Sequence, residues 1–372
     1  PVGGTWVEMD GILPSGESMV RQFLHGQRFF RQEFGSYVTE FWLPDSFGYS
    51  GQLPQIMLGA GITGFVTQKL SWNMINKFPN STFWWEGIDG SRMLSHFPPA
   101  DNYCSTLDVE QLLFMVKNAQ GKEKMNHSLA LYGHGDGGGG PTPEMLDRVR
   151  ICENVDGLPK VKFGTPKEFF DVCRTVDETK GGLNTWRGEL YLEMHRGTYT
   201  SQASTKKGNR KGEVLLRDIE IYAIMAGLHD AGTYPDAELD RLWKLLLLNQ
   251  FHDVLPGSSI RLAYDDALEY YRQIQESGSK LRDEALSKLI EYHAATTTTT
   301  TASSDESESS NQQHQVTVFN SVSWDRREVV ELPSGVQGAQ KIEGTEKYLA
   351  IVEAPSVGYQ VQSCDMTLSD EL

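Results

Sequence analysis

The stretch SYVTEFWLPDSFGYS, residues 36–50, indicates a β-strand that runs into an acidic loop. Residues 36–43 alternate in the manner of a strand, and a proline follows them at once. The loop places one carboxylate, Asp45, between the aromatic residues Trp42 and Phe47. Aromatic faces with a single carboxylate suit a sugar ring, whose C–H faces stack while its hydroxyls form hydrogen bonds. The alternative is a plain Pro-Asp turn in which Asp45 caps the next helix.

Strand and helix patterns alternate on both sides of this stretch. Residues 64–67 and 128–132 are typical of short strands, and residues 17–34 and 109–118 have helical spacing. Strand–loop–helix repetition predicts an α/β layered or barrel domain over residues 1–194. In such domains the chemistry sits in loops after the C-terminal ends of strands.

The chain changes character after residue 195. Three long helical patterns follow one another there with few strand signals: 213–228, 236–251 and 262–292. They predict a helical bundle over residues 195–293. Residues 294–315 contain a run of threonines and a serine-rich acidic run, which predict a disordered linker. Strand patterns between residues 316 and 372 predict the start of a β domain.

Composition bounds the class of protein. A chain of 372 residues is long enough for two or three domains. Acidic residues outnumber basic ones 50 to 34, for a net charge of −16, which argues against nucleic-acid binding. No apolar run approaches the roughly 18 residues of a membrane span, and four scattered cysteines are too few for a disulfide scaffold. We expect an intracellular enzyme.

Because the chain starts at Pro1 without a methionine and ends in a strand-rich stretch, we also expect an internal piece of a longer protein.

The second candidate loop is rich in glycine. In YGHGDGGGGPT, residues 132–142, six of eleven residues are glycine. Glycine permits positive φ and close backbone approach, so the loop is suited to present Asp136 to a substrate. No Gly-Lys-Ser/Thr follows, which makes a phosphate loop a weak alternative, and a mobile surface loop stays the plain one. His134, two residues before Asp136, and His96 are the histidines that we expect to line a site.

The third candidate lies in LLLLNQFHD, residues 245–253. Helical spacing places His252 on the buried face of Leu245 and Leu248. A histidine there is either a hydrogen-bonded core residue or a metal ligand, since neutral imidazole is the commonest metal ligand. Its second nitrogen needs a partner, for which Asp253 and Asn249 are the candidates.

The three loops together resemble those of glycoside hydrolase family 38, the retaining α-mannosidases, in its cytosolic-type branch. Four further motifs reinforce the resemblance: PVGGTWVEMDG at 1–11, TQKLSWN at 67–73, WWEGIDGS at 84–91 and GELYLEMHRGTYT at 188–200. It covers nearly the whole chain except the threonine tract. The resemblance implies a seven-stranded β/α barrel-like catalytic domain whose first strand is missing, then a three-helix bundle and the start of a β-sandwich.

The resemblance also implies roles for individual residues. Asp45 matches the nucleophile, which in the family is also a metal ligand, and Asp136 matches the general acid/base. His252 matches a metal-ligating histidine, and Lys69 falls where other branches place a basic residue near the nucleophile. Phe47 matches an aromatic residue beside the bound sugar. The substrate-binding residues that we predict are Phe47, Lys69, Trp42, His134, Glu189 and Tyr199.

The implied function is that of a retaining α-mannosidase that removes terminal non-reducing α-D-mannose from free oligosaccharides or N-glycan fragments. One divalent metal, Zn²⁺ or Co²⁺, is implied as cofactor. The family's His-x-Asp ligand pair is expected upstream of Pro1, so a chain that starts there should bind metal weakly and have little activity. The expected partner is a mannose-containing oligosaccharide, without nucleic acid or membrane, and a homo-oligomer stays open.

Two other function classes remain as alternatives. One is a catalytically inactive, mannosidase-like protein that binds carbohydrate through its aromatic residues. The other is a metal-dependent hydrolase of another kind, such as a polysaccharide deacetylase, which requires a complete His/Asp ligand set. The predicted location is the cytoplasm, with a lysosome or vacuole as the alternative.

Overall fold

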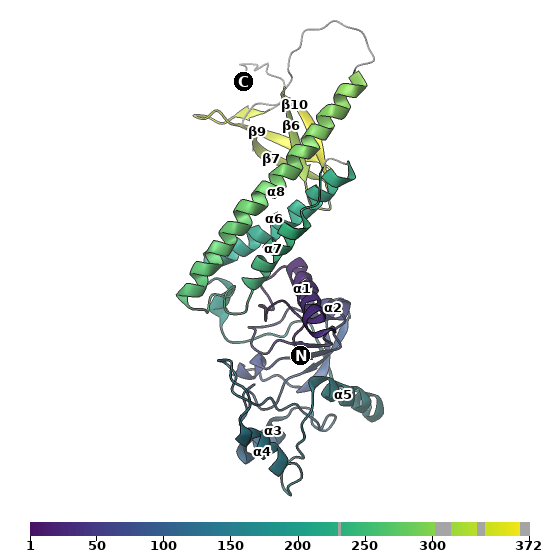
Figure 1. The fold of residues 1–372 in the computed structure, drawn as a ribbon, viewed down its shortest axis with the longest axis vertical. Helices are drawn as coiled ribbons and strands as arrows, with labels where there is room; N and C mark the ends of the chain where they lie inside the picture. Colours follow the sequence, from purple (N-terminus) through teal and green to yellow (C-terminus); the bar gives the residue numbers. More distant parts are fainter. Residues whose placement is uncertain (230–231, 302–313, 333–338, 365–372) are drawn as a thin grey trace. The chain divides into compact units, whose positions relative to one another are not determined.

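The computed structural model describes residues 1–229, 232–301, 314–332 and 339–364, and Figure 1 shows their helices and strands. The chain divides into two compact units. The first comprises residues 1–213 and 241–274, and the second comprises residues 214–240 and 275–372. Across the described ranges, we find no helix with the length and apolar character that a membrane crossing requires.

A five-stranded sheet organises the first unit, with the strand order β1-β2-β4-β3-β5. Its strands are β1 (Glu40–Trp42), β2 (Gly64–Val66), β3 (Thr82–Glu86), β4 (Arg92–His96) and β5 (Thr185–Arg187). The first three neighbours, β1, β2 and β4, are parallel, whereas β3 is antiparallel to β4. The predicted α/β class is confirmed. The resemblance implied seven strands in a barrel-like arrangement; the described residues place five in this sheet, and the barrel is not confirmed.

Side chains of the sheet alternate between two apolar layers. Phe41, Phe65 and Met93 belong to the core cluster that includes residues of helices α1 (Gly16–Phe34) and α2 (Leu53–Gly59). Their neighbours in the chain belong to a second cluster with helix α5 (Pro166–Lys180): Trp42, Val66 and Leu94. Because successive strand residues point to opposite faces, each strand contributes to both layers. Because β1, β2 and β4 are parallel, they end at one edge of the sheet, from which the loops that carry Asp45 and Lys69 start.

Helices α3 (Val109–Asn118) and α4 (Pro143–Ile151) lie side by side in Figure 1. They share a small core with the segments around them: Leu107, Leu112, Val149 and Cys152. The predicted helices 17–34 and 109–118 are confirmed by α1 and α3. The hydroxyl of Thr142 accepts a hydrogen bond from the Met145 N–H, so α4 begins directly after the glycine-rich loop.

The predicted strand 128–132 is wrong. The segment is extended but forms only one bridge, between Tyr132 and Ser105. The Leu129 N–H, which a ladder would use, donates instead to His96 Nε2 at 3.2 Å. A side chain has therefore taken the backbone donor that a neighbouring strand would otherwise pair with.

The three predicted helices after residue 195 are present as α6 (Ala203–Leu228), α7 (Asp236–Leu248) and α8 (Arg261–Thr301). Helix α6 begins before the predicted residue 213, and α7 ends before residue 251. The linker was expected from residue 294, but α8 continues through Thr301, and residues 302–313 lie outside the described residues. A long helix adds residues at little cost once it is nucleated. The packing of a three-helix bundle is not confirmed.

The second unit contains two small antiparallel sheets. One pairs β6 (His314–Asn320) with β10 (Gly358–Cys364), and the other has the order β7-β9-β8. The latter strands are β7 (Arg326–Leu332), β8 (Gln340–Lys341) and β9 (Tyr348–Ala354). Apolar side chains from both sheets form one cluster, which includes Val316, Val318, Ala350 and Val352. The β-sandwich that the resemblance implied for this region stays a prediction. The domain boundaries expected from the sequence stay predictions.

The packing of α1 generates a stability prediction. A Cβ added at Gly26 would lie 2.3 Å from the backbone carbonyl carbon of Thr5, so Gly26→Ala forces the N-terminal segment away from the helix. We expect a loss of about 1–3 kcal/mol or more in the free energy of unfolding, measured by urea titration with circular dichroism. Gly59→Ala is the matched control, because a Cβ there meets nothing within 4 Å and should stabilise by about 0.4–1 kcal/mol. Equal effects of the two changes would contradict the packing.

Candidate active site

The loop after β1 places Asp45 against a lysine from the loop after β2. Lys69 Nζ lies 2.5 Å from Asp45 Oδ1, and Lys69 begins the 3₁₀ helix η1 (Lys69–Trp72). The backbone N–H groups of Gln68 and Lys69 both donate to the carbonyl oxygen of Pro44, at 3.3 and 3.0 Å. Backbone hydrogen bonds thus join the loop after β1 to the loop after β2. The alternative that Asp45 caps a helix is wrong, because α2 begins at Leu53 and the Asp45 carboxylate is paired with Lys69.

His252 faces the other carboxylate oxygen of Asp45. Its Nε2 lies 3.8 Å from Asp45 Oδ2 and 3.8 Å from Asp253 Oδ2. Its Nδ1 lies 2.9 Å from the carbonyl oxygen of Glu8. A carbonyl only accepts, so this hydrogen bond assigns a proton to Nδ1, and in the neutral ring the lone pair is then on Nε2. The partner of Nδ1 is therefore Glu8, rather than the predicted Asp253 or Asn249.

The helical face predicted for His252 is wrong. Helix α7 ends at Leu248, which is 41% exposed, so the residues that follow leave the helix before His252. They pair instead with the start of the chain: the Asp10 N–H donates to the Gln250 carbonyl at 2.9 Å, and the His252 N–H donates to the Glu8 carbonyl at 3.0 Å. This antiparallel pairing joins residues about 240 positions apart, which helical periodicity alone does not reveal.

A network of buried polar side chains supports the pairing of residues 8–10 with residues 250–252. Gln22 of α1 donates to the Gln250 side-chain oxygen at 3.2 Å and to the Leu247 carbonyl at 2.9 Å. Gln250 in turn donates to Asn209 at 2.9 Å and to the Glu213 carboxylate at 3.3 Å. A buried polar network holds a unique geometry when its members are satisfied. The position of His252 is therefore set by contacts with α1 and α6.

Aromatic rings surround the Lys69–Asp45 pair. Lys69 Nζ lies 3.9 Å from the centroid of the Trp72 ring and 5.3 Å from that of Phe47. The His195 ring lies 4.8 Å from Phe47 and 5.5 Å from Trp72. Burial and the Lys69 charge lower the pKa of His195, which favours a neutral imidazole. His195 and Trp72 stand inside motifs quoted above, but the sequence did not single them out.

Two further carboxyl groups approach the site from the N-terminal segment. Burial raises the pKa of Glu8, with His252 acting in the opposite direction and Asp45 adding to the rise. Burial also raises the pKa of Asp10, against the backbone N–H groups of Leu13 and Ile12, which donate to its Oδ1. Sequence reasoning missed both residues, because no pattern in residues 1–11 marks one carboxylate as buried.

The glycine-rich loop holds Asp136 in the left-handed region, at φ 54°. The His134 N–H donates to the Gly140 carbonyl at 3.1 Å, which closes the loop. A Cβ on Gly135 would lie 3.0 Å from the Tyr103 ring, so the loop packs closely against this ring. Burial raises the pKa of the Tyr103 phenol to about 12, with Asp45 and Asp136 as the next causes. Both carboxylates therefore act on one phenol, which the sequence analysis did not identify.

The remaining predicted site residues lie in different surroundings. Trp42 is partly buried in the α5-facing core layer, and His134 is exposed in the glycine-rich loop. Burial raises the pKa of Tyr199, with Glu189 as the second cause, so these two predicted rim residues are neighbours. The structure brings together Asp45, Lys69, Phe47 and His252. The substrate contacts assigned to Trp42, His134, Glu189 and Tyr199 stay predictions.

Comparison with known proteins identifies the family. Residues 1–189 match the model of the glycosyl hydrolases family 38 N-terminal domain, and residues 193–289 match that of the alpha mannosidase middle domain. The chain belongs to glycosyl hydrolase family 38. The predicted resemblance is confirmed.

Relatives within family 38 are similar over most of this chain. Alpha-mannosidase 2C1 of Mus musculus is 49% identical over 360 residues, which are 96% of this chain and 32% of that protein. Alpha-mannosidase G of Dictyostelium discoideum is 54% identical over 274 residues, which are 74% of this chain and 25% of that protein. The chain thus spans about a third or less of the length of these curated relatives.

Solved structures share the fold. An alpha-mannosidase from Enterococcus faecalis V583 aligns with a TM-score of 0.68 at 20% identity, over 98% of this chain and 45% of that one. A family 38 protein from Enterococcus faecalis aligns with a TM-score of 0.64 at 23% identity, over 89% of this chain and 35% of that one. Both support the mixed α/β architecture.

The donor set tests whether the metal implied by family 38 fits. Asp45 Oδ2 and the lone pair of His252 Nε2 lie 3.8 Å apart, and both are ordinary ligands of Zn²⁺. In the parts of the chain that the structure describes, no group of three or more His, Cys, Asp or Glu side chains is suited to hold a metal ion. The two donors fit part of a site and do not complete it.

His96, which the sequence suggested as a site-lining residue, is a buried structural residue. It is 0% exposed, and its Nδ1 lies 2.9 Å from the Thr82 hydroxyl. Its Nε2 accepts the Leu129 N–H at 3.2 Å, which requires the neutral ring. Burial lowers the pKa of His96 to about 3.

This burial predicts a pH dependence of stability. An unfolded histidine has a pKa of about 6.5. Between pH 6.5 and 3 the unfolded chain therefore binds a proton that the folded chain does not, and stability falls as the pH falls. The slope from His96 is about 1.4 kcal/mol per pH unit. Urea titrations from pH 7 to 4 should show His96→Gln less stable at pH 7 but with a flatter slope. His127→Gln, at an exposed position, should keep the parent slope; an unchanged slope in His96→Gln would contradict the assignment.

Proposed function

We propose that this chain carries the catalytic site of a retaining α-mannosidase that acts on mannose-containing oligosaccharides. The observation that carries the proposal is the Asp45 carboxylate of a family 38 chain, with one oxygen 2.5 Å from Lys69 and the other 3.8 Å from His252. The similar proteins of Mus musculus and Dictyostelium discoideum are both named alpha-mannosidases, which supports the same substrate class. Since the chain covers about a third or less of these proteins, the activity is proposed for the whole protein.

The proposed reaction uses two carboxyl groups in two steps. In the first, the Asp45 carboxylate attacks the anomeric carbon of the terminal mannose, while Asp136 donates its proton to the departing glycosidic oxygen. The C–O bond to the rest of the oligosaccharide breaks, and a mannosyl ester of Asp45 forms. In the second, Asp136 takes a proton from water, whose oxygen attacks the same carbon and frees Asp45. Two inversions give net retention, which requires the carboxyl groups to lie about 5–5.5 Å apart.

The surrounding residues supply binding and orientation. Lys69 holds one oxygen of Asp45, which leaves Oδ2 on the side of His252. The rings of Phe47 and Trp72 flank the Lys69 ammonium and offer apolar faces for the C–H faces of a sugar. Holding the reactants in one geometry contributes to the rate by itself.

The proposal includes one divalent metal ion, Zn²⁺ or Co²⁺, with Asp45 and His252 as two of its ligands. When bound, such an ion orients sugar hydroxyls and stabilises negative charge. No observation favours the catalytically inactive alternative over a hydrolase. Removal of mannose from free oligosaccharides or N-glycan fragments in the cytoplasm, and the oligomeric state, stay predictions.

A slow, activated substrate tests the role of Asp45. With 5-fluoro-α-mannosyl fluoride and added Zn²⁺ or Co²⁺, we expect a covalent sugar adduct on Asp45, because fluoride leaves without protonation. Peptide mass spectrometry locates the adduct, and Asp45→Asn should abolish it. Asp136→Ala should still be labelled, whereas its hydrolysis of unactivated mannosides should fall on the order of 10²–10⁴-fold.

Asp156→Asn is the matched control, because Asp156 is an exposed aspartate in a turn, and it should be labelled like the parent. An adduct on another residue would overturn the role of Asp45. The whole protein is used for this test, since the activity is proposed for it, and no adduct on the folded whole protein would count against the proposed function.

The incomplete donor set predicts weak metal binding by this chain. Isothermal titration with Zn²⁺ should give a dissociation constant orders of magnitude weaker than that of a four-ligand site, since only Asp45 and His252 contribute. His252→Ala should remove the remaining binding, and His127→Ala should not, because His127 is exposed at another loop. Tight binding of one metal ion per chain would show that residues outside this pair complete the site.

A further inference from the structure

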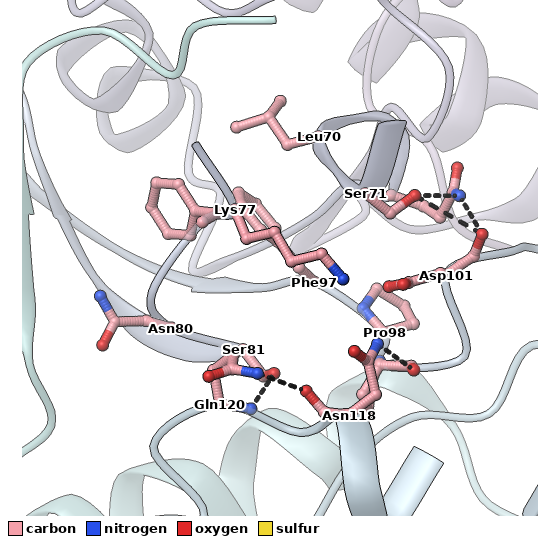
Figure 2. Close-up of a pocket in the computed structure, with 13 residues that line it drawn as sticks. Leu70, Ser71, Lys77, Asn80, Ser81, Phe97, Pro98, Asp101, Asn118 and Gln120 are labelled. Atoms are coloured by element: carbon pink, nitrogen blue, oxygen red, sulfur yellow. Dashed lines mark hydrogen bonds between the residues drawn. The ribbon is translucent and has the colours of Figure 1, made fainter. Parts of the chain in front are cut away.

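A pocket opens beside the catalytic loops of the first unit, and Figure 2 shows the side chains that line it. Its walls come from η1, the segment before β3, the loop after β4 and the end of α3. The cavity volume is about 60 Å³, which accommodates several water-sized groups at about 10–15 Å³ each. The two or three hydroxyls at the edge of a sugar ring are groups of that size.

The pocket contains one positive and one negative side chain. Figure 2 shows Lys77 extending across the pocket toward Asp101. Burial raises the pKa of Asp101, while a hydrogen bond from Asn118 and the charge of Lys77 lower it. Since the charges balance, the pocket suits neither an anion nor a cation. A hydroxyl group both donates and accepts, so a neutral polyol matches an ammonium, a carboxylate and an amide placed together.

Contacts within the pocket fix the positions of its polar groups. Asp101 lies in the left-handed region at φ 55°, a conformation that costs energy and persists only where its surroundings impose it. Its carbonyl oxygen accepts a hydrogen bond from Gln68 Nε2 at 2.7 Å. Gln68 lines the pocket and is 3% exposed, and its Oε1 has no hydrogen-bond partner in the structure. A buried amide oxygen without a partner is uncommon in native proteins and points to an absent donor.

Apolar surface completes the lining. Leu70, Phe78 and Phe97 face the same cavity as the polar groups. Sugar rings present C–H groups on their faces and hydroxyls at their edges, so apolar walls beside polar side chains suit them. The Asn118 side chain is itself fixed, since its Nδ2 donates to the Pro99 carbonyl at 2.9 Å.

The pocket adjoins the proposed nucleophile. Gln68 and Leu70 line it and flank Lys69, whose Nζ is 2.5 Å from Asp45. Consecutive Cα atoms are about 3.8 Å apart, so one turn of chain carries both the contact with the nucleophile and the wall of the pocket. The wall of the pocket is thus formed by the chain neighbours of the residue that contacts the proposed nucleophile.

We propose that this pocket receives the hydroxyl edge of the second sugar of the substrate, on the leaving-group side of the bond that is cleaved. The inference rests on the proposed function and deepens it. Lys77 donates to one ring hydroxyl, Asp101 accepts from its neighbour, and Phe78, which is partly exposed, contacts the C–H face. The chain then selects an oligosaccharide over a single mannoside, because only the former fills both places.

A binding experiment tests the pocket without relying on turnover. Asp45→Asn serves as the background, so that the ligand is not cleaved. ¹⁵N-labelled chain is titrated with α-1,2-linked mannobiose and, separately, with methyl α-mannoside, while the side-chain amide signals of Asn80, Asn118 and Gln120 are followed. We expect saturable shifts of these signals with mannobiose, and an affinity at least tenfold higher than for the mannoside.

Variants of the two charged residues assign the effect. Lys77→Met and Asp101→Asn should each lower mannobiose affinity at least fivefold and leave the methyl mannoside unchanged. Asparagine tolerates the left-handed conformation, so Asp101→Asn keeps the fold. Lys162→Met and Asp156→Asn are the matched controls at exposed positions and should bind both sugars like the background chain.

The outcomes separate the pocket from the proposed function. Equal affinity for the two sugars, no binding of either, or mannobiose binding that ignores both variants overturns the inference. If Asp45 is labelled by the fluoride reagent but mannobiose is not preferred, only the pocket assignment fails. If mannobiose binding depends on Lys77 and Asp101 while Asp45 is never labelled, the pocket stands and the proposed function fails.

Discussion

One carbonyl oxygen, that of Glu8, accepts two hydrogen bonds from His252, and the assembly of the site depends on them. The backbone N–H of His252 fixes the position of the residue, and the ring Nδ1 fixes its orientation. Together they leave Nε2 facing Asp45. Because these partners are about 240 residues apart, the bonds form only when the helical segments pack against the α/β sheet. The buried Gln22–Gln250 contact holds that packing in one register.

Backbone strain gathers around the same place. Asp136 and His195 have positive φ, and so does Asp101 in the neighbouring pocket. Such residues persist where surrounding structure over-determines them, which is common at functional sites. In each case a contact explains the constraint: the Tyr103 ring packs on Gly135, the Phe47 ring lies against His195, and Gln68 binds the Asp101 carbonyl. Strain and the charged groups thus share one edge of the sheet.

Local patterns in the sequence predicted much of the fold. Helix α3 was found with its bounds and α1 to within one residue, and the strand before Asp45 was found as β1, which is shorter than the predicted 36–43. The predicted strand at 128–132 failed because the His96 ring accepts the N–H of Leu129, a contact between distant segments. The prediction that His252 lies on a helical face was wrong because α7 ends at Leu248. Beyond that residue, tertiary pairing with residues 8–10 replaces helical hydrogen bonds. Trp42 belongs to the core layer that includes α5 residues, and its predicted substrate contact stays a prediction.

By itself, the sequence determined the family, the α/β class and the identity of the acidic loops, because motifs such as WLPDSFGYS and GHGDGGGGPT record side-chain chemistry in a fixed order. Only the tertiary structure decided which residues meet. It showed that Lys69 forms an ion pair with Asp45 and that the Glu8 carbonyl orients His252. It also showed that both proposed catalytic carboxylates raise the pKa of Tyr103, and that Lys77 and Asp101 share a pocket. The physical reason is that periodicity reports the nearest neighbours along the chain, whereas burial, ion pairs and pKa shifts arise between segments that folding brings together.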